Sequence, residues 1–258
     1  MVTDIKFLKR PKIKNAVLFS GLPGIGLVGK IAADYIIRQF KTEKIAEIYS
    51  DSFPPAVHTN NGIIEPIKDD IVHFKANRKS FLFVVGPVQP SLDLRGVSPE
   101  HYEFAEEIVS ALHRRFKLSQ IITLAGINIG ERRMNKQPNV IVAATNKKLL
   151  NEFAKLGCVI NRHGGLISGA AGLLISFGRL HKIEGACLMG ETNANLIYGD
   201  HGAAKRVVEV VAKKFNLKIK MDAIEKEAKR IEESFAKLRR QIEMEETSDE
   251  KQHISYVR

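Results

Sequence analysis

Short apolar runs alternate with segments of helical apolar spacing between residues 15 and 217. Apolar runs bounded by turn residues are typical of strands that are covered on both faces. Longer segments with apolar residues three and four apart predict helices that pack one face on such strands. The pattern predicts strands at residues 15–20, 44–49, 63–67, 71–74, 81–86, 121–125, 140–144 and 186–190, and helices at 31–37, 99–116, 145–157 and 203–215.

This alternation predicts an α/β fold with three layers, in which helices cover both faces of a mostly parallel sheet. One segment departs from the pattern, because Asp69 and Asp70 separate two short apolar runs. We interpret residues 63–74 as a hairpin at the sheet edge, since Pro66 disfavours a central strand. The hairpin would make the sheet mixed.

The helix starts are marked by capping residues. Ser98 precedes Pro99, and Thr145 precedes the next helix, which Gly157 would close. Ser168 lies in a glycine-rich segment without the spacing of a nucleophile elbow, so we expect it to cap a helix as well.

From Met221 onward the composition changes, because glycine and proline no longer occur. Apolar residues then follow a heptad-like spacing with charged flanks. These are Ile224, Ala228, Ile231, Phe235, Leu238 and Ile242. The helix packs either on its own domain or on another subunit. An acidic stretch follows it and predicts a flexible tail. The expected units are an α/β domain over 1–222, a helix over 223–243 and a tail over 244–258.

The composition fits a globular protein of 258 residues with a full core. No apolar run approaches the roughly 20 residues that span a bilayer, and no apolar signal segment follows the basic N-terminus. We therefore expect a cytoplasmic protein without membrane contact. Cys158 and Cys187 lie in apolar runs and are expected to be buried thiols. The net charge is +11, but the basic residues are scattered and lack nucleic-acid-binding motifs, so we do not expect a nucleic-acid partner.

The turn over residues 21–30 has the letters of two nucleotide motifs. Gly24, Gly26 and Gly29 follow the dinucleotide pattern, and Gly24 to Lys30 make up most of a phosphate-binding loop. A strand, a glycine turn and a helix start together form a candidate anion site. Glu191, at the end of a later strand, would be placed to contact the same ligand.

Neither motif is complete. The phosphate loop requires Ser or Thr after the lysine to hold magnesium, and this chain has Ile31. Three inserted residues, 21–23, lengthen the turn of the dinucleotide pattern. The structural interpretation is that the glycines permit close helix–strand packing and positive φ. The histidines are dispersed, so we predict no catalytic residue, metal site or cofactor.

Several longer motifs resemble one family. The segments are 21–30 followed by Ala32-Ala33-Asp34-Tyr35, then 45–55, 143–146, 167–174 and 190–192. They occur in the order found in the PAC2 family, the proteasome assembly chaperone family, and the likeness covers roughly residues 8–222. The resemblance implies a three-layer α/β fold distantly like nucleoside phosphorylases, without established catalytic activity.

The resemblance also implies a function. Archaeal members self-assemble, and some act as chaperones or activators of the 20S proteasome. Activators dock a C-terminal tail whose tyrosine is second from last, whereas here Tyr256 is third from last, before Val257 and Arg258. We expect a non-enzymatic, self-assembling chaperone-like protein that binds partners through oligomer surfaces and this C-terminal arm. The alternative is a ligand- or nucleotide-binding protein or enzyme that uses the Gly24–Lys30 turn.

Overall fold

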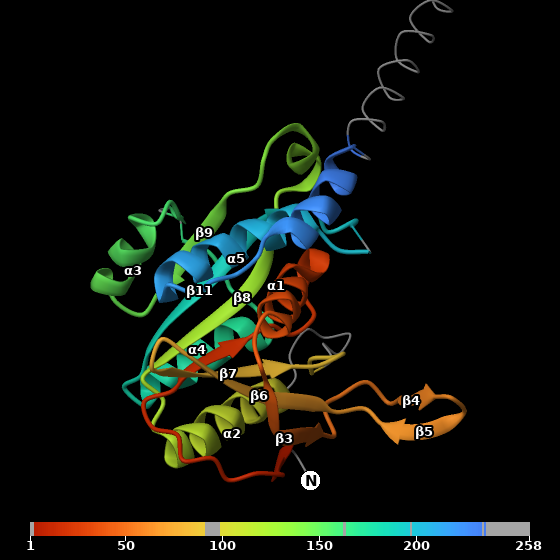
Figure 1. The fold of residues 1–258 in the computed structure, drawn as a ribbon, viewed down its shortest axis with the longest axis vertical. Coiled ribbons are helices and arrows are strands. Elements are labelled where there is room, and N and C mark those ends of the chain that lie inside the picture. Colours follow the sequence, from red (N-terminus) through yellow and green to blue (C-terminus); the bar gives the residue numbers. More distant parts are fainter. Residues whose placement is uncertain (1–2, 91–98, 162–163, 197, 234, 236–258) are drawn as a thin grey trace, which may run out of the picture.

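The structure, a computed structural model, describes residues 3–90, 99–161, 164–196, 198–233 and 235. Within them, nine strands form one mixed sheet in the order β1-β3-β6-β7-β2-β8-β11-β9-β10 (Figure 1). The strands of this sheet are β1 (Thr3–Phe7), β2 (Val17–Ser20), β3 (Glu43–Ser50), β6 (Asp69–Ala76), β7 (Lys79–Val85), β8 (Gln120–Asn128), β9 (Val140–Ala144), β10 (Val159–Ile160) and β11 (Glu184–Thr192). A separate hairpin pairs β4 (Val57–Asn60) with β5 (Ile63–Pro66).

The centre of the large sheet is parallel, since β7, β2, β8 and β11 run side by side in one direction. Antiparallel pairs join β1, β3, β6 and β7 on one side, and β11 pairs antiparallel with β9 on the other. Of these central strands, β2, β7 and β11 are buried over nearly their whole length, as expected for strands covered on both faces, and β8 is buried over residues 121–124.

Helices form a layer on each face of the sheet. The helices are α1 (Val28–Arg38), α2 (Pro99–Phe116), α3 (Lys147–Ala154), α4 (Gly169–Leu180) and α5 (His201–Phe215), with short 3₁₀ turns η1 (Ile25–Leu27) and η2 (Gly130–Asn135). One core cluster joins α1, α3 and α5 to the sheet, and the other joins α2 and α4 to its opposite face. Successive side chains of β2 point to opposite faces of the sheet, because Phe19 belongs to the first cluster and Leu18 to the second. The predicted three-layer α/β/α fold with a mixed, mostly parallel sheet is confirmed.

The predicted pairing of residues 63–67 with 71–74 is wrong. Strand β5 pairs with β4, whereas β6 is an inner strand between β3 and β7. Asn61 and Gly62 have φ of 49° and 80°, and such paired positive values form the tight turn favoured in two-residue hairpins. This turn closes β4–β5 and leaves Pro66 at the end of an exposed strand, where no ladder hydrogen bond is lost. In Figure 1 the hairpin projects from the body of the molecule.

The cap of α3 is one residue later than predicted. Asn146 is the N-cap, and its side chain accepts a hydrogen bond of 2.8 Å from the Leu149 backbone N–H. The Thr145 hydroxyl instead accepts from the Gly185 backbone N–H at 3.0 Å, which ties the end of β9 to β11. Ser98 lies outside the described residues. Cys158 and Cys187 are both free and buried, as predicted.

The C-terminal helix is described over residues 222–233 and packs on its own domain. Ile224 belongs to the core cluster of α1 and α5, and Ala228 and Phe235 are also buried. The described part of the apolar seam is therefore covered within a single chain, while Leu238 and Ile242 lie outside the described residues. Across the part of the chain that the structure describes, every helix is too short or too polar to span a bilayer.

Candidate functional site

The glycine turn allows the start of α1 to lie directly against the sheet. A Cβ atom on Gly29 would lie 2.0 Å from the Leu124 carbonyl oxygen, and one on Gly126 would lie 2.1 Å from the Ile25 carbonyl oxygen. Gly26 has φ of 59°, and its missing Cβ leaves room for Thr192. These contacts confirm the structural interpretation of the turn, because only glycine fits such a close approach.

Two of the residues considered for a ligand site are held elsewhere. The Lys30 ammonium donates to Asp34 on its own helix at 2.5 Å. Glu191 accepts hydrogen bonds from the Lys136 ammonium at 2.9 Å and from the Asn139 backbone N–H at 3.0 Å. Burial alone would raise the pKa of Glu191, but the contacts with Lys136 and Asn139 outweigh it and lower the pKa below its usual value. Glu191 therefore fastens the loop before β9 to the end of β11.

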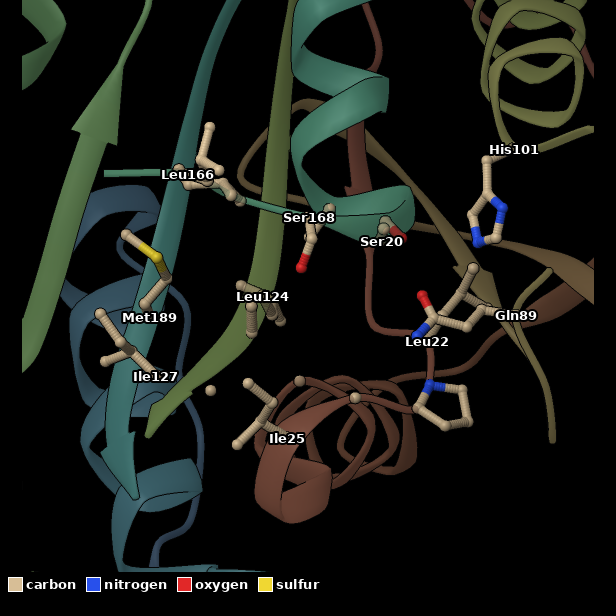
Figure 2. Close-up of a pocket in the computed structure, with 18 residues that line it drawn as sticks. Ser20, Leu22, Ile25, Gln89, His101, Leu124, Ile127, Leu166, Ser168 and Met189 are labelled. Carbon is tan, nitrogen blue, oxygen red and sulfur yellow. The ribbon is translucent and has the colours of Figure 1, made fainter. Parts of the chain in front are cut away.

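A cavity of about 320 Å³ lies beside the turn (Figure 2). Its walls come from the carboxyl ends of β2 and β8, from β11, and from the segments that lead into α1 and α4. Gly24 and Gly29 line it, whereas Gly26, Lys30 and Glu191 are not among the described residues of its wall. The structure thus places a hollow at the glycine turn but does not bring the five proposed ligand residues together.

The wall of the cavity is mostly apolar with a small polar part. The polar side chains are those of Ser20, Gln89, His101 and Ser168. His101 is only 5% exposed, and its Nε2 atom is buried without a hydrogen-bond partner among the described residues. Ser168 is the N-cap of α4, but its hydroxyl makes no capping hydrogen bond. In Figure 2 this hydroxyl points into the hollow.

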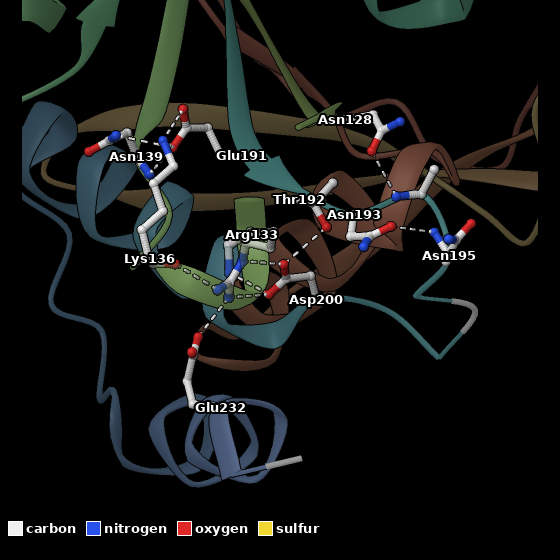
Figure 3. A network of polar contacts seen from close by, with 12 residues as sticks. Asn128, Arg133, Lys136, Asn139, Glu191, Thr192, Asn193, Asn195, Asp200 and Glu232 are labelled. Carbon is white, nitrogen blue, oxygen red and sulfur yellow. Dashed lines mark hydrogen bonds and ion pairs between the residues drawn. The ribbon is translucent and has the colours of Figure 1, made fainter. Parts of the chain in front are cut away.

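A second polar site lies at the carboxyl end of β11, where Thr192 belongs to it, and is organised around Arg133 (Figure 3). The side chain of Arg133 is 0% exposed. Its Nε and Nη2 atoms donate to the Asp200 carboxylate at 2.7 and 3.0 Å, and Nη2 also donates to Glu232 at 2.7 Å. Burial alone would lower the pKa of Arg133, but these two carboxylates outweigh it and raise the pKa. The guanidinium is therefore a permanent buried cation with two anionic partners.

Asp200 connects this cation to the rest of the fold. Its side chain caps α5 by accepting from the Ala203 backbone N–H at 2.9 Å, and it accepts from the Thr192 hydroxyl at 3.0 Å. Glu232 lies on the C-terminal helix, and the guanidinium carbon of Arg133 lies 5.2 Å from the centre of the Phe235 ring. The network thus joins η2, β11, α5 and the C-terminal helix.

The sequence does not reveal Arg133, because it lies in the short 3₁₀ turn η2 between β8 and β9 and no periodicity marks it. An available signal was Asp200, a residue type favoured at N-caps, which lies three residues before the predicted helix at 203–215 and directly before the observed start of α5. A buried capping carboxylate requires a cationic or hydrogen-bonding partner, but the sequence does not say which of the 40 Lys and Arg residues supplies it.

Exposed apolar side chains mark a different candidate surface. Every residue of β4 and β5 is exposed, including Val57 at 56% and Ile63 and Ile64 at 67% each. An isolated two-stranded hairpin is at best marginally stable in water. A hairpin that carries exposed β-branched residues therefore has the properties of a contact surface for another protein chain.

Comparison with known proteins places the chain among related sequences and structures. The model of the PAC2 family matches residues 18–239. An uncharacterized protein of Methanocaldococcus jannaschii is 37% identical over 232 residues, which cover 88% of this chain and 84% of that protein. The crystal structure of Pyrococcus furiosus PbaB, an archaeal proteasome activator, matches with 32% sequence identity and a TM-score of 0.82. The match covers 92% of this chain and 99% of the PbaB chain. Pyrococcus furiosus PbaA, an archaeal homolog of proteasome-assembly chaperone, is 25% identical with a TM-score of 0.72 and covers 100% of both chains.

Proposed function

Because the chain belongs to the PAC2 family, we propose that it is a non-enzymatic, self-assembling, chaperone-like protein of the cytoplasm that binds a protein partner. The observation that carries this proposal is the similarity to PbaB, which covers 92% of the chain, and the family match extends to residue 239 and so includes the C-terminal helix. The partner that fits this relationship is the 20S proteasome.

The β4–β5 hairpin is the surface that we assign to self-assembly. Val57 and Ile64 lie on one face of the hairpin, because residues two apart on a strand point to the same side and Ile64 is paired with Thr59. Both side chains are more than half exposed in the single chain. A second copy that covers this face would remove apolar surface from water, at roughly 25 cal/mol per Å².

The C-terminal arm is the part that we assign to the partner. Tyr256, Val257 and Arg258 lie outside the described residues, but the helix that precedes them is held to the body by the Arg133–Glu232 ion pair and by the burial of Phe235. A chain from residue 235 to residue 256 can span at most roughly 70 Å. A helix that is fixed to the domain and followed by a chain of that length would allow the terminal residues to reach a partner while the domain stays in place.

Self-assembly is tested by light scattering after size-exclusion chromatography. The Ile64→Asp variant should form smaller assemblies than the unmodified protein, because a charge replaces an apolar contact. Asn60→Asp is the matched control, since it adds the same charge to the hairpin without removing an apolar side chain. A monomeric unmodified protein would overturn the self-assembly part of the proposal.

Partner binding is tested with purified archaeal 20S proteasome on a sensor surface. Removal of residues 244–258, and the single change Tyr256→Ala, should both weaken binding. Ser248→Ala lies in the same tail and serves as the control. Unchanged binding after removal of the tail would assign the contact to another surface and refute the role of the arm.

A further inference from the structure

The cavity beside the glycine turn lies where open α/β sheets usually bind small ligands. Strands β2 and β7 are parallel neighbours, but α1 follows β2 onto one face of the sheet and α2 follows β7 onto the other. Chain segments that leave adjacent strands in opposite directions open a crevice at the carboxyl ends of those strands. The cavity lies in this crevice, with Ser20 at the end of β2 and Gln89 after the end of β7.

The polar part of the cavity offers hydrogen-bond donors. The first backbone N–H groups of a helix have no partner within the helix. In α4 the N-cap hydroxyl of Ser168 does not bond to them, and Gly169 and Ala171 of the first turn line the cavity. Helix starts of this kind attract anions, because the N–H groups and the helix dipole favour negative charge.

His101 provides independent evidence for a ligand. Its ring is almost wholly buried, it lines the cavity, and its Nε2 atom has no partner among the described residues. Figure 2 shows the ring on the same side of the hollow as Gln89. A buried polar atom without a partner is unfavourable unless something else satisfies it, and a ligand group in the cavity would do so.

The remaining wall defines the ligand class. Among the described residues that line the cavity there is no Asp, Glu, Lys or Arg, so none of these residues supplies a fixed charge to balance a phosphate dianion. Leu22, Leu124, Ile127 and Met189 give the hollow an apolar surface. A volume of about 320 Å³ is near the lower end of the range for small-molecule sites.

We propose that this cavity binds a small carboxylic acid with an apolar body, whose carboxylate is held by Ser168, His101 and the start of α4. The apolar body lies against Leu124, Ile127 and Met189. None of the described residues that line the cavity belongs to the β4–β5 hairpin assigned to self-assembly, so the site adds a ligand-binding function to the protein.

The test is isothermal titration calorimetry on the full chain with 3-phenylpropionate and hexanoate as probes. Both acids should bind, and 3-phenylpropionamide should bind roughly tenfold more weakly or not at all, because it lacks the charge. Inorganic phosphate and AMP are titrated in the same way, as anions of a different class. Absence of heat with both acids, equal binding of the amide, or tighter binding of phosphate or AMP would each overturn the proposal.

Variants locate the site. Ser168→Ala should weaken acid binding roughly tenfold, and Ala171→Leu should abolish it by filling the hollow. Ser176→Ala is the matched control, since Ser176 lies on the same helix but does not line this cavity. Circular dichroism checks that each variant is folded. If the Ser168 and Ser176 variants bind the acids equally well, the carboxylate is not held at the start of α4 and the proposal is wrong.

Discussion

Replacement of Asp200 by alanine should leave the buried Arg133 guanidinium without its main partner. Asp200 accepts two hydrogen bonds from Arg133, and both side chains are 0% exposed. Glu232 remains as an acceptor, but it is 29% exposed and contacts only one nitrogen. The change therefore leaves a buried cation that is incompletely neutralised, and it also removes the cap of α5.

The expected loss in the free energy of unfolding follows from these two effects. Removal of one partner of a buried ion pair costs about 3–5 kcal/mol, and loss of an N-cap costs about 1 kcal/mol. Because one side chain makes both contacts, the two effects are not independent and the total is expected at about 3–5 kcal/mol. This is a large part of the 5–15 kcal/mol that is typical of a folded domain. Asp200→Asn retains an acceptor for the cap and should lose less.

The assay is equilibrium unfolding in urea, followed by far-ultraviolet circular dichroism at one fixed protein concentration, because self-association alters apparent stability. Glu227→Gln is the control. It breaks an ion pair with Arg230 in which the side chains are 41% and 61% exposed, and it should change stability by less than about 0.5 kcal/mol. A loss below about 1 kcal/mol for Asp200→Ala would refute the reasoning, since it would mean that Arg133 reaches solvent or another anion.

Three further predictions concern a buried carboxyl group, the glycine turn and the two buried thiols. Burial raises the pKa of Asp69 from 3.8 to about 8, so between these two pH values the folded state keeps a proton that the unfolded chain has lost. The free energy of unfolding, measured in urea, should be full below pH 3.8 and fall by at most about 6 kcal/mol as the pH rises to about 8. The Asp69→Asn variant should lose this dependence on pH. Gly29→Ala places a Cβ 2.0 Å from a carbonyl oxygen of β8 and should destabilise the fold by about 1–3 kcal/mol or more. Gly24→Ala meets no atom within 4 Å, has an extended φ of −162° and should change the melting temperature little, so equal effects of the two changes would contradict the packing argument. Cys158 and Cys187 should resist iodoacetamide at neutral pH until denaturant is added, because burial raises the pKa of each thiol to about 11, and rapid modification of the native protein would show that burial is incomplete.

Much of the fold could be predicted from local pattern because burial acts on each strand separately. A strand covered on both faces must be apolar at successive positions, and β7 and β11 meet this requirement without reference to their neighbours. Strand pairing could not be predicted in the same way. The apolar runs at 63–67 and 71–74 are adjacent in sequence, yet the Asn61-Gly62 turn pairs the first run with β4, and β6 joins β3 and β7.

By itself the sequence determined the layered α/β architecture, the close-packed role of the glycine turn and the resemblance to one family, because these depend on residue types at fixed local spacing. Only the tertiary structure decided which side chains from distant parts of the chain become neighbours. It placed Gly24 and Gly29 at a cavity with His101 and Ser168, while Lys30 pairs with Asp34 on its own helix. It also brought Arg133, Asp200 and Glu232 together across 99 residues of chain. The physical reason is that a buried charge or an unpaired donor is satisfied by groups from any part of the chain, and these become neighbours only when the layers have packed.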